Sequence, residues 1–250
     1  MKKNMMIRLA ACAAAAIATS TAGTAFADAP MLTHRWSFNG DYGDSAGGSQ
    51  SSATACGTYV SLYGNRVHMG CGNCSHGTGY VDLGTNRLDT TAATIEIWAR
   101  HDGVQSWSRI FDYGADDTHY FTLTWTLGTT FGQDRATAKN TAEQNVDGSM
   151  GPYEIGTDYY IAVTFERQGD ATVVNWQRRD AATGELQKSG SMTMANGIHN
   201  IVDPVLYLGH SQYSSDKDAL AAYDEVRVWR GVLTDEQLAA SASAGPDAAI

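Results

Sequence analysis

Short runs that alternate apolar and polar residues follow one another along most of this sequence of 250 residues. Gly, Asn, Asp and Ser separate the runs, and helical periodicity is almost absent before residue 234. Alternation sends successive side chains to opposite faces of a strand, so that one face can be buried. The run 94–100 shows this best, with Ile95, Ile97 and Ala99 on one face. The pattern predicts an antiparallel, all-β protein.

The number of such runs predicts how the strands are arranged. About a dozen strands are too many for one open sheet, so we expect two stacked antiparallel sheets. The residues Thr-Asp-Glu-Gln at 234–237 form a capping box that begins one short C-terminal helix, and Gly245-Pro246 ends it. The segment 128–157 has no apolar pattern, and we expect a long surface loop there.

The N-terminus has the features of a secretory signal peptide. Two lysines precede an Ala-rich apolar run that is too short to span a bilayer, and Ala25-Phe26-Ala27 provides small residues for cleavage. We therefore expect a signal peptide at 1–27 and one domain at 28–250. An alternative interpretation takes Leu9-Ala10-Ala11-Cys12 as the cleavage site of a lipoprotein signal peptide. This interpretation is less favoured, because Arg8 interrupts the apolar run directly before it. No later stretch is long and apolar enough for a membrane span, so the expected location is secreted, periplasmic or cell-surface.

The charge of the chain limits the classes of partner that it can bind, and its cysteines predict a disulfide. The formal net charge of −10 becomes −13 without residues 1–27, which hold three basic residues and no acid. Nucleic acid is therefore excluded as a partner, because phosphate binding needs clustered Lys and Arg. Cys56, Cys71 and Cys74 remain after cleavage, and in an oxidising compartment we expect two of them to form a structural disulfide, with the pairing open. A zinc site at Cys71 and Cys74 would need two further ligands that only scattered histidines could supply.

Several segments in order carry a resemblance to a known family. They read Arg-Trp-Ser-Phe-Asn-Gly at 35–40, Gly-Tyr-Val-Asp-Leu-Gly at 79–84, Ala-Thr-Ile-Glu-Ile-Trp-Ala-Arg at 93–100 and Tyr-Asp-Glu-Val-Arg-Val-Trp at 223–229. This ordered set resembles the laminin G-like (LamG-like) domains of the concanavalin A-like lectin/glucanase superfamily. The resemblance implies a two-sheet antiparallel jelly-roll sandwich, which agrees with the alternation pattern. Lectins, adhesive modules and polysaccharide-cleaving enzymes all occur on this fold, so the site must decide the function.

The strand expected to carry catalytic acids argues against an enzyme. A retaining glycosidase needs two carboxylates roughly 5 to 5.5 Å apart. Glu96 has Trp98 and Arg100 where the superfamily's glucanases carry further acids. We expect no catalytic residues, and we expect Glu96 to join a structural network with Glu225 and Arg227.

The expected ligand site lies on the loop rim of the sandwich. Trp36, Trp98 and Trp229 occupy framework positions of the family, and Trp125 falls on an apolar face, so these four are expected in the core. Trp107 follows a loop and could present its ring at an edge of the sandwich. Sugars bind well to exposed aromatic faces that have hydrogen-bonding groups beside them. The predicted ligand-binding residues are Trp107, Tyr113, Asp116, Asp117 and His119, with parts of 128–157.

One structural calcium ion is the cofactor that the resemblance makes plausible. Asp41 and Asp44 follow the first strand, and Asp224 and Glu225 lie in the last one. These segments are neighbours in the family's fold, so their oxygens could converge on a hard cation. The alternative is that Asp41 and Asp44 serve only turn chemistry.

The sequence therefore predicts a secreted, non-catalytic LamG-like binding module. A glycan is the first ligand class. An adhesive or structural envelope module that binds an extracellular protein is the alternative. A polysaccharide-degrading hydrolase or lyase, suggested only by fold relatives, comes third.

Overall fold

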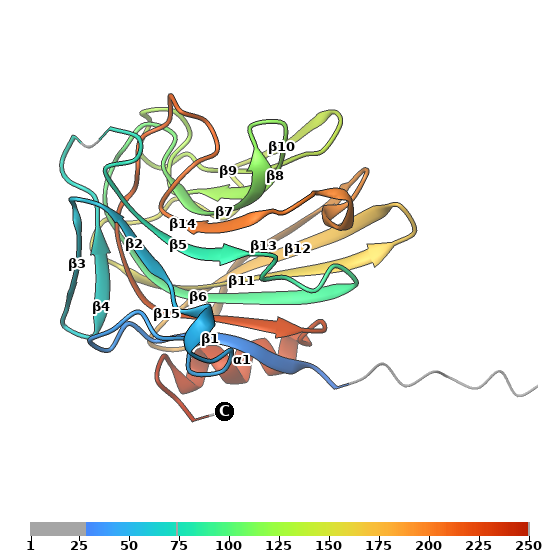
Figure 1. The fold of residues 1–250 in the computed structure, drawn as a ribbon, viewed down its shortest axis with the longest axis horizontal. Helices are drawn as coiled ribbons and strands as arrows, with labels where there is room; N and C mark the ends of the chain where they lie inside the picture. Colours follow the sequence, from blue (N-terminus) through green and yellow to red (C-terminus); the bar gives the residue numbers. More distant parts are fainter. Residues whose placement is uncertain (1–28, 74, 250) are drawn as a thin grey trace, which may run out of the picture.

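The computed structural model describes residues 29–73 and 75–249, in which the strands form two stacked antiparallel sheets. Figure 1 shows the sheets as two layers with the helix α1 (Asp235–Ala244) beneath the lower one. This confirms the predicted two-sheet sandwich with one short C-terminal helix. The predicted signal peptide, 1–27, and Cys74 lie outside the described residues.

The lower layer is an eight-stranded sheet in the order β13-β12-β11-β6-β15-β4-β3, and β1 pairs with β15 beside this path. Its strands are β1 (Met31–Trp36), β3 (Val60–Tyr63), β4 (Arg66–Met69), β6 (Ala92–Gly103), β11 (Asp158–Gln168), β12 (Ala171–Asp180), β13 (Leu186–Met194) and β15 (Leu220–Arg230).

The upper layer is a seven-stranded sheet in the order β10-β9-β8-β7-β14-β5-β2. Its strands are β2 (Thr54–Gly57), β5 (Gly79–Thr85), β7 (Arg109–Asp116), β8 (His119–Thr124), β9 (Arg135–Lys139), β10 (Glu143–Asp147) and β14 (Val205–Leu208). Two short 3-10 helices span Ser49–Ser51 and Ile198–Asn200.

The main core lies between the two sheets and follows the alternation of the sequence. Ile95, Ile97 and Ala99 of β6 are buried in it, as predicted, together with Trp36 and Trp125. Side chains at the alternate positions face outward from the sheet, toward water or toward an element that covers this face. The alternation in each strand therefore determines which side chains form the core between the two sheets.

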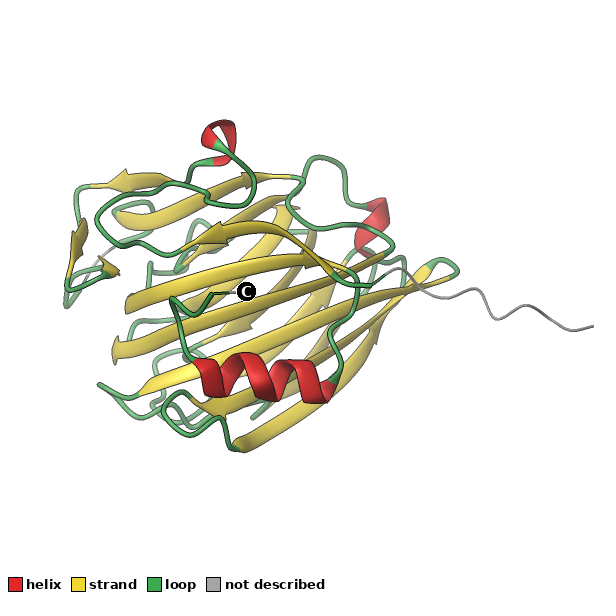
Figure 2. Ribbon diagram, turned by 90° about the horizontal axis from the view of Figure 1, so that it is seen from below, coloured by secondary structure: helices red, strands yellow, loops and turns green. Residues whose placement is uncertain are grey.

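The helix α1 covers the outer face of the eight-stranded sheet, as Figure 2 shows from below. Leu238 and Ala242 of α1 pack with Trp98 and Tyr160 of β6 and β11 in a second apolar cluster. The predicted capping box is present, because the Thr234 side chain accepts from the Gln237 N–H and the Gln237 side chain accepts from the Thr234 N–H. Trp98 is therefore buried as predicted, but on the helix side of its sheet.

The expectation of a long loop over 128–157 is wrong. This segment contains β9 and β10, which pair as an antiparallel hairpin at the edge of the seven-stranded sheet. Ala136 and Ala138 face the core between polar residues, so the apolar side of β9 consists only of alanines. Such small side chains leave a weak hydrophobic signal, which explains the error.

Within the described residues, the chain has no helix that combines the length and the apolarity needed to cross a membrane.

Candidate binding site on the outer face of the seven-stranded sheet

The outer face of the seven-stranded sheet is polar because its strands alternate. Phe111, Tyr113, Phe121 and Leu123 of β7 and β8 face the core. The residues between them face outward on the opposite side, which places Arg109, Asp112, Tyr120, Thr122 and Thr124 on one surface. A polar face directed away from the core is where a sandwich of this kind can receive a hydrophilic ligand.

The segment 209–219, which links β14 to β15, rises over this outer face (Figure 1). The Gln212 side chain donates to the Gly114 carbonyl at 2.9 Å, and the Lys217 N–H donates to the Ser106 carbonyl at 3.0 Å. Asp216 accepts from Arg109 at 2.6 Å. These contacts fix the segment on the sheet.

A pocket of about 230 Å³ lies between this segment and the strands β8 to β10. Its lining combines aromatic rings with charged and hydroxyl groups: Trp107, Arg109, Tyr120, Arg135, Thr137, Glu143, Tyr213 and Asp216. Pockets that bind small polar ligands usually combine flat apolar surfaces with a few directed polar groups. This pocket has both.

Trp107 is held in place at the pocket by its backbone. Its φ of 57° is unusual for a residue other than glycine. Its N–H donates to the Gly128 carbonyl at 3.0 Å, and its own carbonyl accepts from Arg109 at 2.9 Å. The Arg135 guanidinium lies 5.4 Å from the ring centroid. A partly exposed indole fixed in this way can offer surface to a ligand with little loss of conformational entropy.

The two arginines that line the pocket each have an acidic partner. Arg109 contacts Asp216 at 2.6 Å and lies 3.8 Å from Asp112, whereas Arg135 contacts Asp147 at 2.5 Å. Pairing of this kind neutralises most of the charge that a ligand would meet. The two arginines therefore offer little net positive charge with which to attract an anionic ligand.

Asp112 lies fully buried behind Arg109 and does not line the pocket. Its carboxylate oxygens make no hydrogen bond of good geometry. Burial raises the pKa of Asp112 to about 7, although the charge of Arg109 opposes this rise. The carboxyl is thus poised to change charge near neutral pH without touching a ligand.

The predicted ligand-binding residues are only partly brought together. Trp107 lines the pocket. Asp116, Asp117 and His119 are exposed at the turn between β7 and β8, and the Asp117 carbonyl accepts from Lys139, which also donates to the Tyr213 hydroxyl. Tyr113 has no exposed surface and faces the core, so its side chain is not available to a ligand.

Few of the residues that line the pocket were singled out one by one from the sequence. Arg135, Thr137 and Glu143 lie in the segment 128–157, parts of which were predicted to bind the ligand, but they belong to a hairpin and not to a loop. The alternation of Arg135, Thr137 and Lys139 with two alanines is the signal that could have revealed them. Tyr213 and Asp216 come from an irregular segment, and only the tertiary fold brings them to Trp107.

The four acids proposed for calcium do not converge in the structure. Asp44 accepts from three backbone N–H groups and contacts His34, and Asp41 accepts from the Gly43 N–H, which is turn chemistry. Asp224 pairs with Arg66 at 3.2 Å.

Glu225 lies between the guanidinium groups of Arg35 and Arg227, which would repel a cation. The residues present therefore do not fit a calcium ion at this position, and calcium binding elsewhere stays a prediction.

Glu96 serves a structural network beneath α1. It is fully buried and accepts from the Tyr160 hydroxyl at 2.7 Å and from the Trp229 indole N–H at 2.5 Å. Arg227 is its partner in strand register, but the ion pair of Arg227 is with Glu225. The expected network thus consists of two parts, Glu96 with aromatic donors and Glu225 with arginines.

A sequence model of the concanavalin A-like lectin/glucanases superfamily, of the laminin G type, matches residues 75–239. Because the match covers more than half of the chain, the protein belongs to this family. The family's description includes both lectins and glucanases, so membership does not decide between binding and catalysis. No curated protein matches the sequence.

Solved structures share the fold at low sequence identity. Domain 4 of AbnA, a GH43 extracellular arabinanase from Geobacillus stearothermophilus, solved with arabinotriose, has a TM-score of 0.55 and 18% identity, over 84% of this chain and 98% of that domain. Trypanosoma rangeli sialidase with sialic acid has a TM-score of 0.61 and 13% identity, over 86% of this chain and 34% of the enzyme. The binding domain of botulinum neurotoxin DC has a TM-score of 0.52 and 12% identity, over 79% of this chain and 47% of that domain.

The chain thus spans nearly all of the arabinanase domain, about a third of the sialidase and about half of the toxin domain. At these identities the likeness concerns the fold alone.

Proposed function

We propose that this protein is an exported, non-catalytic binding module that holds a neutral glycan in the pocket beside Trp107. The single observation that supports this most is the partly exposed Trp107 indole at a pocket that is also lined by two tyrosines and by hydroxyl, carboxylate and guanidinium groups. Sugar rings pack their C–H faces on aromatic rings, while their hydroxyl groups exchange hydrogen bonds with side chains.

The charge pairing supports a neutral ligand. Arg109 and Arg135 are each bound to a carboxylate, so neither offers an unpaired guanidinium to an acidic sugar. Thr137, Tyr213 and Glu143 supply hydroxyl and carboxylate groups that suit sugar hydroxyls. The arabinotriose complex of the AbnA domain, which has the same fold, is consistent with this ligand class.

The arrangement of acids supports binding without catalysis. Asp216 and Glu143 are the carboxylates that line the pocket. Asp216 accepts from Arg109 and from the Ser211 hydroxyl, so its oxygens are engaged. Asp112, the carboxyl whose raised pKa would suit a general acid, is fully buried and does not line the pocket. Retaining glycosidases use two carboxylates that act on the scissile bond, and here one of the two lining carboxylates, Asp216, is held by Arg109 and Ser211, which supports binding over catalysis.

The test is calorimetric titration with neutral oligosaccharides of arabinose, xylose, glucose and galactose, with sialyllactose as the acidic comparison. We expect binding of a neutral oligosaccharide, and we expect Trp107→Ala to weaken it by at least about tenfold, as hot-spot aromatic residues do. Tyr63→Ala, which removes another exposed aromatic ring on the eight-stranded sheet, is the matched control and should bind like the wild type.

Other experimental outcomes would support one of the alternative functions. Retention of a protein partner with no glycan binding would make the protein an adhesive envelope module. Release of reducing sugar or of unsaturated product from a polysaccharide would make it an enzyme. Export is tested separately, because N-terminal sequencing of the protein outside the cytoplasm should begin at Asp28.

A further inference from the structure

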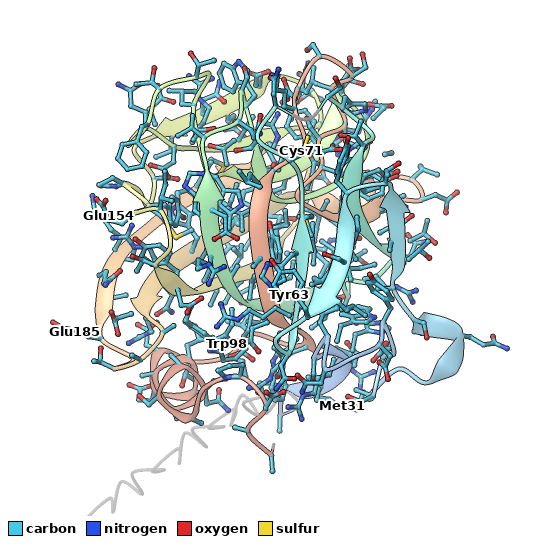
Figure 3. The ribbon with its side chains drawn as sticks, turned by 90° about the vertical axis from the view of Figure 1, so that its left-hand side faces the viewer. Met31, Tyr63, Cys71, Trp98, Glu154 and Glu185 are labelled. Atoms are coloured by element: carbon cyan, nitrogen blue, oxygen red, sulfur yellow. The ribbon has the colours of Figure 1, made fainter. Side chains whose placement is uncertain are left out.

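Two histidines and an aspartate lie close together where the loop between β4 and β5 meets the segment 209–219. His76 belongs to the loop between β4 and β5, which begins near Cys71 (Figure 3), whereas His210 and Asp218 belong to the segment 209–219. Each of the three offers one ligand atom, and these atoms lie within 4.8 Å of one another. Among the described residues no other set of three His, Cys, Asp or Glu side chains meets this condition.

Asp218 organises the cluster from a fully buried position. Its carboxylate accepts from the backbone N–H groups of Gly77, Thr78 and Gly79 at 3.2, 2.6 and 2.8 Å. It also contacts Nδ1 of His210 at 2.7 Å. A carboxylate offers about four lone-pair directions, and these four partners use them. Asp218 therefore fixes the backbone next to His76 and the ring of His210 at the same time.

The His210 ring is held in one orientation. It is buried, it stacks on Tyr80 at a centroid distance of 3.8 Å, and its Nδ1 faces Asp218. A carboxylate that accepts from Nδ1 leaves Nε2 as the nitrogen with a lone pair. This arrangement is the one in which proteins present a histidine to a metal ion.

His76 supplies the observation that points to a ligand. Its ring lies 4.3 Å from the ring of His210, and its Nδ1 is buried without a hydrogen-bond partner. A buried polar nitrogen without a partner costs free energy that a native structure normally avoids. Because the ligand atoms of His76 and His210 lie within 4.8 Å of each other, one cation could be bound by both.

We propose that His76 and His210 bind a divalent transition-metal ion, with zinc as the occupant, and that Asp218 positions His210 for it. Imidazole nitrogens select zinc and its neighbours in the first transition row, whereas calcium and magnesium prefer oxygen ligands. The two histidines come from two different segments, so the ion would tie the loop between β4 and β5 to the segment 209–219.

The experiment uses the full chain, purified without a histidine tag and stripped with EDTA. Zinc is titrated by calorimetry, and cobalt is titrated as a spectroscopic probe, because a nitrogen-ligated cobalt ion absorbs in the visible. The variants are His76→Gln and His210→Gln. The matched control is His119→Gln, which removes an exposed histidine that also contacts an aspartate.

We expect one zinc ion to bind per chain, with a rise in melting temperature, and we expect His76→Gln to weaken binding by more than about tenfold. His76 is only partly buried, so this variant should still fold, which circular dichroism checks. The proposal is overturned if the wild type binds no zinc, or if His76→Gln binds zinc as tightly as the wild type. Retained zinc affinity with no glycan binding would uphold this site and reject the pocket, so the two proposals fail separately.

Discussion

Replacing the buried Asp112 by asparagine should make the protein more stable at alkaline pH. Asp112 is fully buried, and its pKa rises from 3.8 to about 7 on folding. The unfolded chain is therefore ionised at pH 6, whereas the folded chain holds a proton. As the pH rises through this window, the folded state binds more protons than the unfolded state and loses stability. The loss is absent below about pH 4 and complete above about pH 7.

The magnitude follows from the size of the pKa change. Each pKa unit corresponds to about 1.4 kcal/mol, so ionisation of Asp112 in the folded state costs about 4 kcal/mol at pH 8. Asparagine has the same shape and no charge, so Asp112→Asn avoids this cost. Any penalty for the buried amide is the same at every pH. The stability of the variant relative to the wild type should therefore increase by about 3 kcal/mol between about pH 4.5 and pH 8.

Urea unfolding followed by tryptophan fluorescence at several pH values measures this difference. Asp134→Asn is the matched control, because Asp134 is equally buried but accepts from the Ser149 hydroxyl and from the N–H groups of Met150 and Gly151. An amide cannot accept at all of these positions, so the control should be less stable than the wild type at pH 8. A stability difference between Asp112→Asn and the wild type that does not change with pH would refute the reasoning.

Three further predictions concern stability and cofactors. Thr234→Ala removes the N-cap of α1 and should lower the free energy of unfolding by about 1 kcal/mol in urea. Glu96→Gln leaves either the Tyr160 hydroxyl or the Trp229 N–H without its acceptor and should cost about 1 to 3 kcal/mol without changing glycan affinity. A loss of polysaccharide cleavage in this variant would instead show that Glu96 is catalytic. Calcium binding is tested by the melting temperature in calcium against EGTA, where a rise of several degrees would confirm it and an unchanged value would reject it.

The sequence predicts those parts of the fold in which large apolar residues alternate. β6 and α1 follow from Ile95, Ile97 and the Thr234 capping box, because a strand face and a helix start are local properties. The hairpin of β9 and β10 does not follow, since alanines on its core side carry little hydrophobic signal. Local patterns therefore determine the framework, and edge strands with small side chains are missed.

The candidate site was less predictable than the fold. Trp107 could be selected from the sequence because the tryptophans at framework positions of the family were expected in the core. Tyr113 faces the core and not the ligand side, because a tyrosine suits either face of a β strand and does not reveal which face is covered. His76 and His210 are separated by more than a hundred residues and meet only through the pairing of the sheet with the segment 209–219. Contacts of this kind depend on tertiary structure, which single-residue patterns do not record.

The segment 209–219 makes the two proposed sites neighbours on one piece of chain. His210 and Asp218 near its ends belong to the cluster with His76, whereas Tyr213 and Asp216 in its middle line the Trp107 pocket. If an ion at one site restricts the segment, a ligand at the other site meets a wall that is already ordered. Thermodynamic linkage then requires each ligand to change the affinity of the other by the same factor. Eleven residues of irregular backbone would thereby serve as an allosteric coupling element between the two sites.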